Sequence, residues 1–176
     1  MRKKSFPPVV DENTRLLVLG SLPGEASLAA GRYYAHPRNL FWRLMGLVIG
    51  EDLEAQPYEA RLAGLLKHRV GLWDVVAEAA RQGSLDAAIR DPEHNDLLAL
   101  MESLPNLKAV AFNGATSAKV GTRLLAPASD RLALIRLPSS SPAYAGRWEL
   151  KLEAWMQLRA HLNPSPSGRG EISLPS

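Results

Sequence analysis

Apolar runs of strand length alternate along this chain with longer runs of helical spacing. Four runs have the length and composition of buried strands and cover residues 15–19, 70–75, 108–112 and 132–137. The segments of helical type are residues 40–49, 58–68, a short one near 84–89, 95–103, 115–125 and 148–162. This alternation predicts an α/β fold with three αβα layers, in which helices cover both faces of a central, mainly parallel four-stranded sheet.

The chain becomes small or polar where each of the four strands ends. The residues at these ends are, in chain order, Gly20 with Ser21, Asp74, Asn113 with Gly114, and Ser139 with Ser140 and Ser141. Right-handed crossovers between parallel strands bring all four ends to one edge of the sheet. Because ligands bind outside the carboxyl ends of strands in open α/β sheets, we expect a polar cleft at this edge.

The two ends of the chain differ in composition from the part between them. Residues 1–13 are polar and contain proline, which predicts a loose N-terminal arm. Residues 163–176 are rich in proline, serine and glycine, with little apolar area to bury, which predicts a disordered C-terminal tail. Residues 14–162 are enough for one domain with a core of its own.

Composition excludes several classes of protein. No apolar run approaches the roughly 18–20 residues of a membrane span, and the basic first four residues precede Ser-Phe-Pro-Pro instead of an apolar signal core. The absence of cysteine excludes disulfides and iron–sulfur clusters and suits a reducing cytoplasm. The four histidines lack metal-ligand spacing. We therefore expect a cytoplasmic protein with no metal, no cofactor and no membrane contact.

The chain carries a small positive net charge. A net charge of +3 and an isoelectric point near 9.4 are compatible with nucleic-acid binding. A solvated, mildly basic surface explains the same numbers equally well, so the charge alone identifies no partner.

Three motifs occur in a fixed order. They are Gly20-Ser-Leu-Pro-Gly24 with Tyr34-Ala-His-Pro-Arg-Asn-Leu-Phe-Trp42, then Gly71-Leu-Trp-Asp-Val75 with Gly83-Ser-Leu85, then Leu137-Pro-Ser-Ser-Ser-Pro-Ala143. Together they resemble the uracil-DNA glycosylase superfamily, closest to its hypoxanthine-DNA (DNA-deoxyinosine) glycosylase branch, and they are also similar to the mismatch-specific uracil-DNA glycosylases. The resemblance covers residues 14–162, which would then form the glycosylase domain.

This resemblance implies a monofunctional DNA glycosylase that acts as a monomer on double-stranded DNA containing a deaminated base. Such an enzyme flips the base, here hypoxanthine first, and hydrolyses its N-glycosidic bond with water to initiate base excision repair. Alternatives are a mismatch-type uracil-DNA glycosylase and a non-catalytic module of the same fold that binds damaged DNA. A small-molecule hydrolase using Ser21 is the weakest alternative, because no His–Asp partners for it are identifiable.

Asn39 is the candidate catalytic residue. An amide does not titrate near neutrality, but it can donate and accept hydrogen bonds, so it could orient the attacking water or polarise the departing base. Asn39 also directly precedes a predicted helix, a position where asparagine is a preferred cap. The resemblance favours the catalytic role, and the two roles are compatible.

The resemblance also implies which residues contact the base. They are Gly20, Ser21, Tyr34, Asp74 and Asn113. Tyr34 would stack on the flipped base, and the Asp74 carboxylate would accept the N1–H of hypoxanthine, a proton that adenine lacks. Local alternatives remain open: Tyr33 or Tyr34 anchors its loop to the core, Asp74 caps residues 75–81, and Asn113 belongs to an Asn-Gly turn.

A further set of residues is expected at the DNA backbone and the minor groove. It consists of His36, Arg38, Ser139, Ser140, Ser141, Ala143 and Tyr144. Serines and backbone amides can hold phosphates, and an apolar or aromatic residue after them can fill the gap left by a flipped base. A hydrogen bond from the backbone to the His36 ring is an equally good account of that histidine.

Two positions depart from the superfamily pattern. Leu22 stands where most members carry an Asp or Asn that activates or positions water, and Ser139 stands where many carry a catalytic histidine. The leucine argues against efficient uracil removal and favours the hypoxanthine branch. The missing histidine suggests a slower or differently tuned enzyme.

Overall fold

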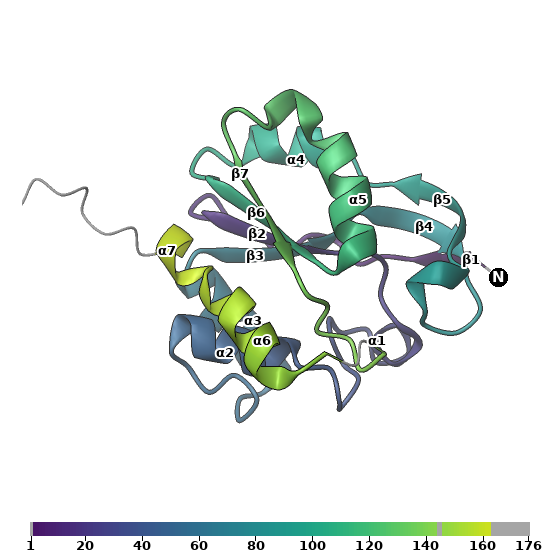
Figure 1. Ribbon diagram of the computed structural model, residues 1–176, viewed down its shortest axis with the longest axis horizontal. Coiled ribbons are helices and arrows are strands. Elements are labelled where there is room, and N and C mark those ends of the chain that lie inside the picture. Colours follow the sequence, from purple (N-terminus) through teal and green to yellow (C-terminus); the bar gives the residue numbers. More distant parts are fainter. Residues whose placement is uncertain (1, 144–145, 163–176) are drawn as a thin grey trace, which may run out of the picture.

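A four-stranded parallel sheet lies between two layers of helices in the computed structural model, which describes residues 2–143 and 146–162 (Figure 1). The strand order is β3-β2-β6-β7, with β2 at Leu16–Gly20, β3 at Val70–Asp74, β6 at Ala109–Asn113 and β7 at Ala133–Leu137. All three pairings are parallel. The predicted three-layer α/β fold is confirmed.

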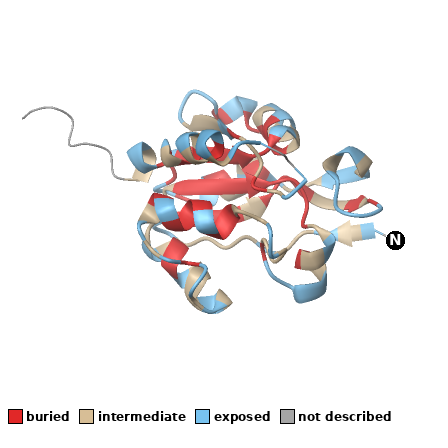
Figure 2. Ribbon diagram, turned by 60° about the horizontal axis from the view of Figure 1, so that its bottom comes forward, coloured by how far each residue is buried: buried red, intermediate tan, exposed pale blue. Residues whose placement is uncertain are grey.

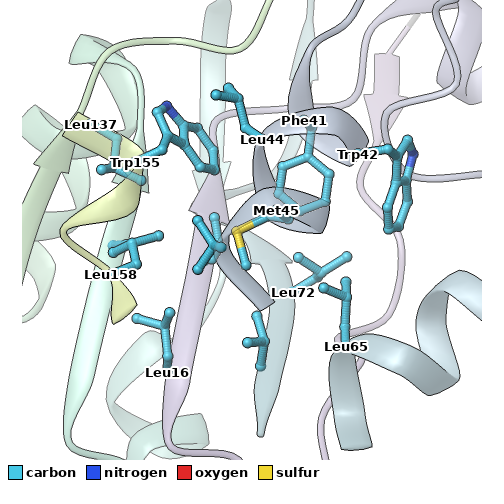
Figure 3. Packing of buried hydrophobic residues seen from close by; sticks show 14 of the residues in the cluster. Leu16, Phe41, Trp42, Leu44, Met45, Leu65, Leu72, Leu137, Trp155 and Leu158 are labelled. Carbon is cyan, nitrogen blue, oxygen red and sulfur yellow. The ribbon is translucent and has the colours of Figure 1, made fainter. Parts of the chain in front are cut away.

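Strand β2 is buried along its whole length because helices cover both faces of the sheet (Figure 2). Leu16 and Val18 belong to one apolar cluster, and Leu17 and Leu19 to the other. Helices α2 (Phe41–Ile49), α3 (Tyr58–Lys67) and α6 (Trp148–Met156) contribute to the first cluster, shown in Figure 3. Helices α4 (Leu97–Ser103) and α5 (Ala115–Leu124) contribute to the second.

A second, antiparallel sheet was not predicted. It has the order β1-β4-β5 and consists of β1 (Arg2–Lys4), β4 (Val76–Ala80) and β5 (Arg90–His94). Strand β5 reads Arg-Asp-Pro-Glu-His and is almost wholly exposed. It has no apolar alternation that could reveal a strand, and its proline is tolerated because β5 is an edge strand.

Residues 2–13 are not the loose arm that the sequence predicts. Strand β1 pairs with β4, and Val9 forms an antiparallel bridge with Leu72 of β3. The Phe6 carbonyl accepts a hydrogen bond of 3.1 Å from the Trp73 indole. Backbone pairing thus attaches this polar segment to the domain without an apolar run of its own. The predicted tail, residues 163–176, lies outside the described residues.

The remaining differences are local. Helix α1 (Glu25–Ala30), between Gly24 and Gly31, was not predicted. The short helix expected near residues 84–89 is the 3₁₀ turn η1 (Asp86–Ala88), a second such turn, η2, covers Ala126–Ala128, and the last predicted helix is divided into α6 and α7 (Arg159–Leu162). No helix within the described ranges has the length and apolar character needed to span a membrane.

Candidate active site

A cavity of about 580 Å³ opens at the carboxyl ends of the parallel strands. Every predicted site residue that the structure describes lines it: Gly20, Ser21, Tyr34, His36, Arg38, Asn39, Asp74, Asn113, Ser139, Ser140, Ser141 and Ala143. Tyr144 lies outside the described residues. The four strand ends therefore meet in one cavity, and the long segment between β2 and α2 supplies much of its wall.

Asn39 lies just before α2, and the backbone fixes its side chain. Its Oδ1 accepts a hydrogen bond of 3.0 Å from the Phe41 N–H, and its own N–H donates to the His36 carbonyl at 2.9 Å. Its Nδ2 makes no hydrogen bond to another described residue. Asn39 thus caps the Phe41 N–H of the first turn from one residue before Leu40, the N-cap residue of α2. This bond leaves one lone pair of Oδ1 and both Nδ2 protons for a ligand.

Asn113 holds the serine loop, residues 139–143, against the end of β6. Its Oδ1 accepts from the Ser140 N–H and its Nδ2 donates to Ser140 Oγ, both at 2.9 Å. The Ser140 carbonyl in turn accepts a hydrogen bond of 3.0 Å from the Leu40 N–H. Asn113 therefore positions Ser140, and through Ser140 it positions the backbone next to Asn39. A contact between Asn113 and the base remains a prediction.

The exposed part of the serine loop is shaped by its own hydroxyls. Ser139 Oγ accepts from the Ser141 N–H at 3.1 Å, and Ser141 Oγ accepts from the Ala143 N–H at 3.2 Å. These two turns leave Pro142 and Ala143 exposed at the rim of the cavity. A DNA-contacting role fits this position and remains a prediction.

His36 and Arg38 lie together at the rim. The ring Nδ1 of His36 accepts a hydrogen bond of 3.1 Å from the Arg38 N–H, so the backbone-bonded alternative for this histidine is present. The Arg38 side chain is exposed. The guanidinium and the second ring nitrogen of His36 are therefore the groups that could reach a phosphate.

The two adjacent tyrosines have different surroundings. Tyr33 is buried, and its hydroxyl donates to the Pro7 carbonyl at 2.9 Å, so it anchors the loop to the core. Tyr34 has a φ of 53°, which is unusual for a residue with a bulky side chain. Its ring stacks on Phe41 with centroids 3.9 Å apart and 17° between the planes. The hydroxyl of Tyr34 is buried and has no hydrogen-bond partner among the described residues.

Asp74 is buried at the end of β3, against the end of β2. A Cβ added at Gly20 would lie 2.5 Å from Asp74 Oδ1, so only glycine permits this approach. Asp74 Oδ2 is buried and unpartnered among the described residues. Burial raises the pKa of Asp74 to about 7; the negative charge of Asp86 adds to the rise, and the Arg81 guanidinium opposes it. The alternative that Asp74 caps residues 75–81 is wrong, because this segment contains strand β4 (Val76–Ala80) and no helix.

Two residues that organise the cavity wall were not identified from the sequence. Asp86 accepts a hydrogen bond of 2.6 Å from the Ser21 hydroxyl. The buried Arg81 donates to the carbonyls of Leu22 and Pro23. Both residues flank the Gly83-Ser-Leu85 motif, and this position was the one indication in the sequence that they belong to the site. A polar turn has no periodicity to show which of its side chains point inward.

The charge of Asp86 can be tested through its effect on Asp74. We expect Asp86→Asn to lower the pKa of Asp74 from about 7, because the amide still accepts from Ser21 but carries no negative charge. An NMR titration of the Asp74 carboxyl carbon measures this pKa directly. Asp130→Asn, which removes an exposed carboxylate just before β7, is the control. If the pKa of Asp74 is the same in wild type and in both variants, the Asp86 charge does not contribute to raising it.

The family model described as the uracil DNA glycosylase superfamily matches residues 7–161. The chain belongs to the uracil DNA glycosylase superfamily. Among the residues that the structure describes, no three His, Asp or Glu side chains form a group that could hold a metal ion.

Relatives within the superfamily cover most of the domain. A Methanosarcina barkeri protein named hypoxanthine DNA glycosylase is 50% identical over 117 residues, which are 66% of this chain and 74% of the relative. A Methanosarcina acetivorans protein of the same name is 48% identical over 114 residues, 65% of this chain and 72% of the relative. The solution NMR structure of a candidate uracil DNA glycosylase from Methanosarcina acetivorans matches with a TM-score of 0.83 and 40% identity, covering 93% of this chain and 99% of that one. The chain is therefore a DNA glycosylase, a hydrolase of N-glycosidic bonds.

Proposed function

We propose that this glycosylase removes hypoxanthine from double-stranded DNA by flipping the deaminated nucleotide into the cavity at the strand ends, as the first step of base excision repair. The observation that carries the proposal is the buried Asp74 carboxyl, whose Oδ2 has no partner among the described residues and which lines this cavity. A volume of about 580 Å³ is in the range of pockets that enclose one small ligand. The two relatives named hypoxanthine DNA glycosylase support the same base.

The reaction breaks the bond between C1′ of the sugar and N9 of the base. The bonding electrons leave with the base, a water oxygen bonds to C1′, and the proton that the water loses neutralises the departing base, which is released as hypoxanthine. Asn39 is proposed to act on this step without changing its protonation state. The hydrogen bond from the Phe41 N–H fixes the direction of the amide, so the remaining lone pair of Oδ1 can orient the water and Nδ2 can donate to the substrate.

Base choice is proposed to depend on Asp74. In its ionised form the carboxyl only accepts hydrogen bonds, and hypoxanthine presents an N1–H where adenine presents a bare N1. Adenine would place an acceptor against an acceptor in a buried site, which costs about 1–3 kcal/mol. Leu22, only 6% exposed, supplies no polar group where most of the superfamily has Asp or Asn, and this disfavours uracil.

Duplexes with a single inosine, uracil or xanthine provide the test, with alkali used to cleave the abasic sites formed. The proposal predicts product from inosine at a rate at least about 10 times that from uracil, because Leu22 supplies no polar group for the uracil reaction. The Asp74 contact does not add to this difference, since uracil also presents an N–H beside a carbonyl. Preferred product from uracil would instead support the mismatch-type alternative. Tight binding of all duplexes without product would identify a non-catalytic DNA-binding module.

A further inference from the structure

We infer that Tyr34 reads the base through its hydroxyl and that Tyr34 and Asp74 together form a two-point reader for a lactam edge, the adjacent N–H and C=O of the base. This inference deepens the proposed function and rests on it. It differs from the stacking role that the family resemblance implies for Tyr34, because stacking uses the face of the ring and makes no use of the hydroxyl.

The two polar groups converge at the end of β2. A Cβ at Gly20 would lie 2.5 Å from Asp74 Oδ1 and 3.1 Å from the Tyr34 hydroxyl. Both oxygens are therefore close to a single point above the Gly20 backbone. Tyr34, Asp74 and Gly20 all line the same cavity, so a base edge that reaches one oxygen is near the other.

Both groups also lack partners among the described residues. The Tyr34 hydroxyl and Asp74 Oδ2 are the two buried side-chain oxygens there without a hydrogen bond of ordinary geometry, and Asp74 as a whole is only 4% exposed. The Asn113 side chain is near enough to the Tyr34 hydroxyl to lower its pKa, but its amide is bonded to Ser140. Buried polar atoms almost always have a partner, and exceptions are typical of functional sites. Asp74 and Tyr34 thus each have one unpartnered buried oxygen and both lie beside Gly20, where Oδ1 is the nearer oxygen of Asp74. This arrangement indicates that a ligand supplies the missing hydrogen bonds.

The ring of Tyr34 is held in place for this task. Phe41 stacks on one face at a centroid distance of 3.9 Å, and the Trp42 ring lies at 82° to the Tyr34 ring with the two centroids 6.5 Å apart. The positive φ of Tyr34 turns the chain so that the side chain enters the cavity wall. The hydroxyl is thus presented at a fixed point instead of sampling many positions.

The chemistry of the pair matches the N1–H and O6 of hypoxanthine, an edge that guanine shares and adenine lacks. Burial raises the pKa of Tyr34 well above its usual value, and the Asp74 charge adds to this, so the hydroxyl keeps its proton and can donate. Donation from Tyr34 to O6 and acceptance by Asp74 from N1–H satisfy both atoms of the lactam edge. Adenine has the reverse arrangement, an acceptor at N1 and a donor at N6. A donor at O6 also stabilises the negative charge that spreads onto this oxygen as the base leaves.

The Tyr34→Phe variant tests the inference, because it keeps the ring, the stack on Phe41 and any stacking on the base while removing only the hydroxyl. Binding is measured to duplexes that hold either 2′-fluoro-deoxyinosine or its nebularine analogue, a purine without O6 and N1–H. The fluorine blocks hydrolysis, so Kd values are obtained independently of turnover. Tyr33→Phe is the matched control. It removes the hydroxyl of the neighbouring tyrosine, which donates to the Pro7 carbonyl and is therefore already used within the protein.

The expected result is that wild type and Tyr33→Phe prefer the inosine duplex and that Tyr34→Phe loses about 5- to 150-fold of this preference. Its melting temperature should stay close to that of wild type, because the removed hydroxyl makes no hydrogen bond of ordinary geometry to a described residue. An equal preference in wild type and Tyr34→Phe, or no preference in wild type, overturns the reader. A preference that depends on Tyr34 without any release of hypoxanthine from ordinary inosine duplexes refutes the proposed function and keeps the reader.

Discussion

An Asn39→Ala variant is expected to release base at least about 100 times more slowly than wild type, the size of effect seen when one preorganised polar group is removed from an active site. The amide of Asn39 is fixed by the Phe41 N–H, so its free lone pair and its N–H groups are already directed before the substrate binds. The lost helix cap costs only about 0.5–2 kcal/mol of stability. Single-turnover rates at a matched folded fraction separate the two effects.

Two further variants sharpen this experiment. Asn39→Asp keeps an oxygen for the Phe41 N–H but loses the Nδ2 donor. It is expected to fold like wild type and to release base as slowly as Asn39→Ala. Asp96→Ala removes a comparable cap, the one on the Ala99 N–H at the start of α4, and is expected to retain full activity. Near wild-type turnover by Asn39→Ala would show that Asn39 only caps α2.

An Asp74→Asn variant is expected to be more stable than wild type at pH 8 and equally stable near pH 4. Folding raises the pKa of Asp74 from 3.8 to about 7, so the folded state retains a proton that the unfolded chain releases. The stability of wild type therefore falls as pH rises between these values, by up to about 4 kcal/mol. The neutral amide avoids this loss. Free energies of unfolding in urea from pH 4 to pH 9 measure this difference in stability between the two proteins. If their stabilities change in parallel with pH, Asp74 does not retain a proton in the folded state.

The same variant is expected to change base choice. Wild type should discriminate more strongly between hypoxanthine and adenine as pH rises through about 7, because the ionised carboxyl can only accept and a protonated one can donate to N1 of adenine. In Asp74→Asn the amide can rotate to donate or accept, so about 5- to 150-fold of the preference should be lost and its pH dependence should disappear. Single-turnover rates of both proteins on inosine and adenine duplexes measure this preference. If the preference is the same in wild type and Asp74→Asn, Asp74 does not recognise the base.

The parts of the fold that bury apolar area could be predicted from the sequence. Strand β2 is a run of apolar residues covered on both faces, and such a run can be recognised without any knowledge of its neighbours. The cavity followed from the same reasoning, because parallel strands fix where Gly20, Asp74 and Asn113 must meet. Strand β5 could not be predicted, since its residues are polar and exposed and it pairs with β4 through backbone hydrogen bonds.

Contacts between distant polar residues were also beyond prediction. The Ser21–Asp86 hydrogen bond joins residues 65 positions apart, and the Asn113–Ser140 bonds join residues 27 apart. No local pattern encodes such pairs, because each depends on how loops meet after the sheet has formed. The orientation of Tyr34, with its hydroxyl at Gly20, required the left-handed backbone that only the structure reveals.

Chromatographic detection of the free base is the most direct test of the central claim that this cavity hydrolyses the glycosidic bond of hypoxanthine. The protein is incubated with a duplex that contains one inosine, and the soluble fraction is analysed for hypoxanthine while the abasic sites in the DNA are counted. We expect one molecule of hypoxanthine for each abasic site with wild type, and almost none with Asn39→Ala at the same folded concentration. Absence of hypoxanthine with wild type, or equal release by Asn39→Ala, would contradict this claim.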